Sequence, residues 1–161
     1  MDATGSRMQS PYEHTQQGPL VLVLLPLCAG TIVGASTVGE PLLRVLLVCV
    51  GAVFAVLGAM FSRLTVRETG EALDVRFGPL PLAGTRLRYD SVRAVRRARS
   101  RLVDGWGIHW LPGRGWTFNL WGFDCVEVTT DRGLLRIGTD DPDGLLQHLE
   151  RRCGAATTGR A

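Results

Sequence analysis

The sequence contains no lysine, so all 18 of its basic residues are arginines, against 15 acidic residues in a chain of 161. Charge is also scarce in two apolar runs, residues 19–36 and 42–61, which hold no acidic residue and one arginine, Arg44. About 20 apolar residues are needed to cross a bilayer, and the rest of the chain is too small to bury two helices that are apolar on every side. The scarcity of charge therefore argues against a soluble protein that buries both runs.

Residue patterns that catalyse reactions or hold cofactors are missing as well. The four cysteines form no CxxC pair and no Cys/His spacing typical of zinc sites. His14, His109 and His148 have no serine, cysteine or carboxylate at a spacing that indicates a catalytic triad. The glycines around Trp106 are followed by no lysine, which excludes a phosphate-binding loop. We therefore expect no catalytic residue, no cofactor, no metal site and no enzyme.

A membrane anchor is the interpretation that the apolar runs favour. A cleaved signal peptide is the alternative, but signal peptides begin with positive charge, whereas Asp2 and Glu13 accompany Arg7 here. The sequence predicts a two-helix transmembrane hairpin over residues 19–61, with helices at 19–36 and 42–61 and a short linker between them.

Small residues in the first helix bear on how the hairpin packs. Gly30 and Gly34 form a GxxxG pair, which lets helix backbones approach closely. Packing within the hairpin is favoured over a dimer contact.

Arginine placement predicts the orientation of the hairpin. Arg63 and Arg67 follow the second run directly, Arg7 precedes the first, and the linker contains neither lysine nor arginine. By the positive-inside rule both termini are expected in the cytoplasm, with two spans in the cell membrane. Residues 1–18 are then a disordered cytoplasmic leader.

Residues 62–154 read as one mostly β domain of about seven strands, followed by a flexible tail at 155–161. Apolar residues alternate with polar ones, and turn dipeptides separate the runs. A helix ends the domain: Asp141 is a candidate N-cap, Pro142 fits the first helical position, and Gly154 is a suitable stop. Its apolar face is predicted to consist of Leu145, Leu146 and Leu149.

Four segments of this domain carry a resemblance to a known family, and they begin at Leu73 (LDVRFGPL), Ser91 (SVRAV), Gly107 (GIHWLPGRGW) and Gly133 (GLLRIGTDDP). With the leucine helix that follows, they resemble bacterial pleckstrin-homology-like (PH-like) domains of small membrane proteins, of the actinobacterial type. The resemblance covers residues 62–153. It implies a bent barrel or sandwich whose open end is closed by the C-terminal helix, and it implies no catalytic residues. The lysine-led phosphoinositide motif of eukaryotic relatives is absent, so phosphoinositide binding is not implied.

Two groups of residues are candidate contact surfaces. Residues 62–103 contain ten arginines against four acidic residues, directly after the anchor, where anionic headgroups attract basic side chains. The candidate lipid contacts are Arg63, Arg67, Arg93, Arg96, Arg97, Arg99 and Arg101, although an ordinary solvated surface explains them equally well. The candidate partner surface consists of Trp106, Trp110, Trp116 and Trp121, for which core filling is the favoured alternative.

The function that we expect is that of a non-catalytic, membrane-anchored PH-like scaffold or binding module at the cytoplasmic face of a bacterial membrane. Its expected partners are the bilayer itself, anionic lipid headgroups through the arginine face, and a membrane protein; no nucleic acid is expected. The alternative is an accessory structural subunit of a larger membrane complex.

Overall fold

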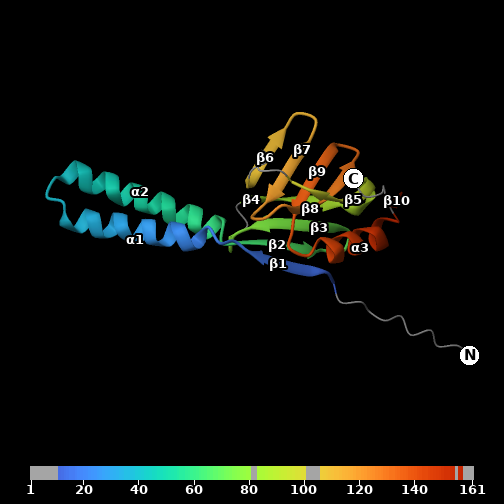
Figure 1. The fold of residues 1–161 in the computed structure, drawn as a ribbon, viewed down its shortest axis with the longest axis horizontal. Coiled ribbons are helices and arrows are strands. Elements are labelled where there is room, and N and C mark those ends of the chain that lie inside the picture. Colours follow the sequence, from blue (N-terminus) through green and yellow to red (C-terminus); the bar gives the residue numbers. More distant parts are fainter. Residues whose placement is uncertain (1–10, 81–82, 101–105, 155, 158–161) are drawn as a thin grey trace, which may run out of the picture.

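The structure, a computed structural model, describes residues 11–80, 83–100, 106–154 and 156–157. A pair of apolar helices projects from one end of a β domain (Figure 1). In chain order the elements are β1 (Glu13–Gln17), α1 (Val21–Thr37), α2 (Pro41–Met60), β2 (Arg63–Glu68), β3 (Ala72–Phe77), β4 (Ala83–Arg88), the 3-10 helix η1 (Tyr89–Ser91), β5 (Val92–Arg99), β6 (Gly107–Leu111), β7 (Gly115–Asn119), β8 (Asp124–Thr130), β9 (Gly133–Gly138), α3 (Pro142–Cys153) and β10 (Ala156–Thr157).

The two apolar helices pack against each other through small residues (Figure 1). Gly51 and Gly58 of α2 are buried, and a Cβ atom at Gly58 would lie 3.6 Å from the Cβ of Leu24. Of the predicted GxxxG pair, Gly34 takes part in the helix contact, since a Cβ atom there would lie 3.6 Å from Cδ1 of Leu47, whereas a Cβ atom at Gly30 would meet nothing within 4 Å. Elsewhere the surface of the pair is apolar and exposed, up to 77% at Leu42.

The prediction of a hairpin made of two transmembrane helices is wrong. Among the described helices only α2, with 20 residues, is both long and apolar enough to cross a membrane. The first apolar helix begins at Val21 and ends at Thr37, so its 17 residues fall short of the length that a crossing needs. The reason is that Pro19 and Leu20, which counted toward the apolar run, precede the helix.

A four-stranded antiparallel sheet, in the order β1-β2-β3-β4, joins both ends of the helical pair. The strand that leads into α1 pairs with the strand that leaves α2, with Glu13 opposite Arg67 and Gln17 opposite Arg63. The prediction that residues 1–18 form a disordered leader is therefore wrong for Glu13–Gln17, and residues 1–10 lie outside the described part. Sequence reasoning missed β1 because its five residues are all polar and show no apolar alternation.

A second sheet has the order β10-β5-β8-β9-β7-β6. Two of its pairs are parallel: β7 with β9, which lies between β8 and β7, and β10 with β5 at the edge of the sheet. The predicted PH-like barrel or sandwich of about seven strands is corrected by these findings: the described residues form ten strands in sheets of four and six. Part of the predicted tail, Ala156–Thr157, forms the last strand.

The C-terminal helix α3 has the predicted signals. The Asp141 carboxylate accepts a hydrogen bond from the backbone N–H of Gly144 at 3.0 Å, and Gly154 ends the helix in the left-handed conformation. Leu145 and Leu149 are fully buried between the two sheets, whereas Leu146 is only partly buried. The same core receives Leu64, Val66, Leu73, Val75, Phe77 and Leu87 from the first sheet, Val95, Phe118, Val126, Val128 and Ile137 from the second, and Leu120, which directly follows β7.

Candidate functional site

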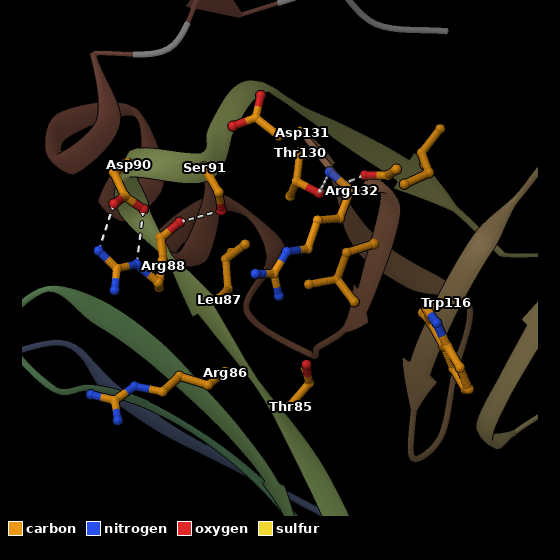
Figure 2. Close-up of a pocket in the computed structure, with 13 residues that line it drawn as sticks. Thr85, Arg86, Leu87, Arg88, Asp90, Ser91, Trp116, Thr130, Asp131 and Arg132 are labelled. Atoms are coloured by element: carbon orange, nitrogen blue, oxygen red, sulfur yellow. Dashed lines mark hydrogen bonds and ion pairs between the residues drawn. The ribbon is translucent and has the colours of Figure 1, made fainter.

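An open groove of about 530 Å³ lies between β4 and the turn that joins β8 to β9 (Figure 2). Four consecutive residues of β4, Thr85–Arg88, form one side. Trp116 of β7, the turn residues Thr130–Gly133 and the first leucines of β9 form the other. Because successive side chains of a strand point to opposite faces, four consecutive lining residues show that the edge of β4 borders the groove.

This edge of β4 has no partner strand among the described residues, since β4 is the last strand of its sheet. The backbone N–H of Tyr89 donates to the carbonyl of Glu71 at 3.2 Å. Antiparallel pairing alternates along a strand, so Thr85 and Leu87 bond to β3 while Gly84, Arg86 and Arg88 direct their backbone N–H groups away from it. A row of donors and acceptors is therefore left open beside the groove.

Most charges in the groove are already neutralised. Arg88 donates two hydrogen bonds to the carboxylate of Asp90, at 3.2 and 2.6 Å. Arg93, outside the groove, does the same to Asp131, at 2.5 and 2.9 Å. Both ion pairs lie at the surface, since their side chains are about half exposed or more. The two acids in the groove are thus satisfied by arginines.

Arg132 is the exception within this lining. Its backbone N–H donates to the hydroxyl of Thr130, but its guanidinium contacts no carboxylate among the described residues. Figure 2 shows this side chain reaching across the groove toward Leu87. The indole of Trp116, which is 51% exposed, lies across the groove from Leu87. The groove therefore combines a cation, an aromatic surface and an open strand edge.

A second charged feature, the ion-pair row, crosses the six-stranded sheet. Glu127 of β8 is 2% exposed and lies opposite Arg96 of β5 and Arg136 of β9. Arg96 donates to one carboxylate oxygen at 2.6 Å, and Arg136 donates to the other at 2.8 and 2.7 Å. A buried carboxylate needs such partners, so this row fixes the register of three strands.

The predicted arginine surface is divided by the fold. The guanidinium of Arg93 pairs with Asp131, that of Arg96 with Glu127, and that of Arg97 with Asp143 at 2.9 Å. Arg99 is exposed and has no ion pair among the described residues, and Arg101 lies outside the described part. Arg97 also lies 3.6 Å from Asp124, so these three arginines, which are close in the sequence, contact four different acids.

The arginines that follow α2 have different environments. Arg67 pairs with Glu13 of β1 at 3.6 Å. Arg63, the first residue of β2, is exposed and has no ion pair among the described residues. It follows the end of α2 by three residues and is the unneutralised charge at that end of the domain.

The four predicted tryptophans form two pairs. Trp110 and Trp116 lie opposite each other in the β6–β7 hairpin and are 57% and 51% exposed. Trp106 and Trp121 stack with ring centroids 4.2 Å apart and are about 40% exposed. The favoured expectation that the four fill the core is therefore wrong, and only Trp116 borders the groove.

The stacked pair Trp106–Trp121 lies at the end of the domain that meets the helices. The Nε2 amide group of Gln16, two residues before Gly18, donates to the carbonyl of Trp121 at 3.1 Å. Gly107, which follows Trp106, is in left-handed conformation, and a Cβ atom there would lie 3.5 Å from the ring of Phe61. Aromatic side chains are thus placed beside the point where α2 ends.

A buried cluster that sequence reasoning missed joins β1 to α3. The ring of His148 stacks on Tyr12 with centroids 4.9 Å apart, and its Nε2 atom lies 2.9 Å from the hydroxyl of Tyr89. The carboxylate of Glu68 accepts from the backbone N–H of Tyr12 and from Arg152. Burial lowers the pKa of His148, against the opposing effect of Glu68. The sequence contains no signal for this cluster, because Tyr12, which stacks on His148, precedes a strand that has no apolar alternation.

Nothing in this arrangement indicates a metal centre: the described residues contain no group of three or more His, Cys, Asp or Glu side chains that could hold an ion. Comparison with protein-family models found no match, and no curated protein is significantly similar to the chain.

Proposed function

We propose that the chain is a non-catalytic binding module that the apolar pair α1–α2 attaches to a bacterial membrane, with its β domain at the cytoplasmic face. The carrying observation is that the strands on either side of the helical pair are neighbours in one sheet. The chain therefore enters and leaves the apolar pair at the same end of the β domain. Exposed leucines and valines around α1 and α2 would be costly in water and are stable in lipid.

Side chains where the helices meet the domain support this placement. Trp106 and Trp121 have the amphipathic rings that favour the boundary between lipid and water. Arg63 supplies a positive charge without a carboxylate partner, directly after α2, which suits contact with anionic headgroups. Contact with lipid is thus assigned to this end of the domain, in place of the paired arginines of β5.

The cytoplasmic assignment rests on the distribution of arginine. The connection Val38–Glu40 between the two helices contains none, whereas Arg63 and Arg67 lie on the β-domain side. Positive residues near apolar helices are retained on the cytoplasmic side of bacterial membranes. The binding function itself is assigned to the groove beside β4, because it presents an open strand edge and an unneutralised guanidinium.

Alkaline carbonate extraction of bacterial membranes tests the anchor. The wild-type chain is expected in the membrane pellet. Val48 and Val53 are both more than half exposed near the middle of α2, and replacing both with arginine adds roughly 2.5–3.5 kcal/mol per charge to the cost of insertion. The double variant is expected in the supernatant or degraded.

Arginine added to the β-domain surface is the matched control. A chain carrying Thr15→Arg and Thr129→Arg, both at exposed positions, should remain in the pellet. Release of the wild-type chain by carbonate would contradict the proposed anchor.

A further inference from the structure

The open edge of β4 is an unusual feature for a protein to leave uncovered. Edge strands present a row of unpaired N–H and C=O groups and serve as templates for another strand. Here the N–H groups of Gly84, Arg86 and Arg88 face away from β3, and among the described residues the one further partner on this edge is the hydroxyl of Ser91, which donates to the carbonyl of Arg88 at 2.7 Å. The edge borders the open groove of about 530 Å³.

The walls of the groove discriminate between side chains. Leu134 and Leu135 are partly buried, and Trp116 is half exposed, so apolar groups can gain buried area there. Arg132 reaches between them and β4, and its guanidinium lacks a carboxylate among the described residues. Asp90 and Asp131 are satisfied by Arg88 and Arg93, so the unmet charge of the lining is positive.

We propose that this groove binds an extended, acidic peptide segment of a partner protein, which adds to β4 as a further strand and places a carboxylate against Arg132. Backbone hydrogen bonds to β4 supply affinity, and alternate side chains of the peptide supply specificity. The inference rests on the proposed function, since it names the partner class of the same binding module.

A lipid headgroup is excluded from this groove by its position. Gly78, after β3, packs against Met60 at the end of α2, so β4 begins near the helices at Ala83 and ends away from them at Arg88. The groove borders the later part of β4 together with η1 and the β8–β9 turn. A bilayer around α2 does not reach that side of the domain.

The test uses the full chain in phosphatidylcholine nanodiscs and three synthetic peptides. The probe is acetyl-Thr-Val-Thr-Asp-Thr-Val-Thr-amide, which as a strand places its aspartate and both valines on one face. The two comparison peptides carry asparagine or lysine in place of the aspartate. Amide resonances of the chain, followed by NMR during titration, report both the site and the dissociation constant.

The aspartate peptide should shift the amide resonances of Gly84, Arg86 and Arg88 and the indole resonance of Trp116. It should bind about tenfold more tightly than the asparagine peptide, as a charge-assisted hydrogen bond implies, and the lysine peptide should bind least. Arg132→Gln should abolish the preference for aspartate and leave binding of the asparagine peptide unchanged.

Two variants of one residue test the addition of a strand. Arg86→Pro removes an N–H that faces the groove, at an edge where proline is tolerated, and should weaken the aspartate and asparagine peptides alike. Arg86→Gln removes the same charge but keeps that N–H, so it is the reference variant, and the proline variant should bind the asparagine peptide more weakly than Arg86→Gln does. Unchanged resonances of β2 and β3 show that the proline variant is folded; if it is not, the Arg132→Gln comparison decides.

Equal binding of the aspartate and asparagine peptides, or shifts that spare β4, would overturn the inference, and so would the absence of binding. This outcome is separable from failure of the membrane proposal. Peptide binding is measured in nanodiscs whatever the location of the chain in cells, and carbonate extraction does not depend on the groove.

Discussion

The backbone N–H of Gly18 donates a hydrogen bond to the carbonyl of Ser62 at 2.9 Å. One residue lies just before α1 and the other just after α2, so a single bond joins the two ends of the apolar pair. Because β1 and β2 continue this pairing, the helices cannot separate at their base without opening the four-stranded sheet. The apolar pair α1–α2 and the β domain are thus one continuous structure.

Replacement of Gly18 tests how closely the two chains approach. A Cβ atom at Gly18 would lie 2.2 Å from the carbonyl oxygen of Phe61, which is backbone and cannot move aside cheaply. We expect Gly18→Ala to reduce the free energy of unfolding by about 1–3 kcal/mol, as overpacking does. Thermal unfolding in detergent micelles measures it. Gly30→Ala, where a Cβ meets nothing within 4 Å, is the control and should not be destabilised.

Removal of Glu127 should be far more costly than removal of a surface acid. Glu127→Ala leaves Arg136, whose side chain is only 14% exposed, beside an empty position in the sheet, and breaking a buried pair costs roughly 3–5 kcal/mol. Asp90→Ala breaks an exposed pair with Arg88 and should cost at most about 1 kcal/mol. Urea denaturation of the two variants compares them. Equal losses would mean that the ion-pair row does not organise the sheet.

The leucines of α3 should differ in their contributions. Leu149 is fully buried between the sheets, so Leu149→Ala is expected to cost about 2–5 kcal/mol. Leu146 is only partly buried, so Leu146→Ala should cost clearly less. A larger loss at Leu146, measured by the same urea method, would contradict the placement of α3.

Acidification should weaken the contact between β1 and α3. The pKa of His148 is lowered from its ordinary 6.5 by burial, so in acid the unfolded chain takes up a proton that the folded chain excludes. The contribution of His148 to the free energy of unfolding is therefore fully present above pH 6.5. It decreases as the pH falls from 6.5 toward the lower pKa of the folded state. The measurement is the midpoint of thermal unfolding at a series of pH values. His148→Gln should remove this dependence, whereas His14→Gln should retain it.

Local patterns in the sequence predicted some elements well. The capping signals of Asp141 and Gly154 specified α3 almost to the residue, because they depend only on neighbouring groups. The polar strand β1 and the parallel pairing of β7 with β9 depend on partners more than fifteen residues away, and alternation does not identify them.

The candidate site was harder to predict for the same reason. The sequence indicated only that Arg132 lies in a turn. The structure distinguishes it from other arginines, because the nearby acids Asp90 and Asp131 pair with Arg88 and Arg93 instead. The arginines around Arg97 looked like one basic surface, but the carboxylate partners of Arg93, Arg96 and Arg97 come from β8, the turn after it and α3. Net charge along a sequence therefore overestimated the free positive surface.

Thr15 of β1 and Thr65 of β2 offer the most direct test of the account, since they lie opposite each other with hydroxyl oxygens 3.0 Å apart. Each is replaced singly by cysteine in a full chain without other cysteines, and spheroplasts are treated with a membrane-impermeant maleimide. We predict that both positions remain unlabelled in intact spheroplasts and that both are labelled after permeabilisation. Labelling of either position in intact spheroplasts would contradict a β domain that lies wholly at the cytoplasmic face.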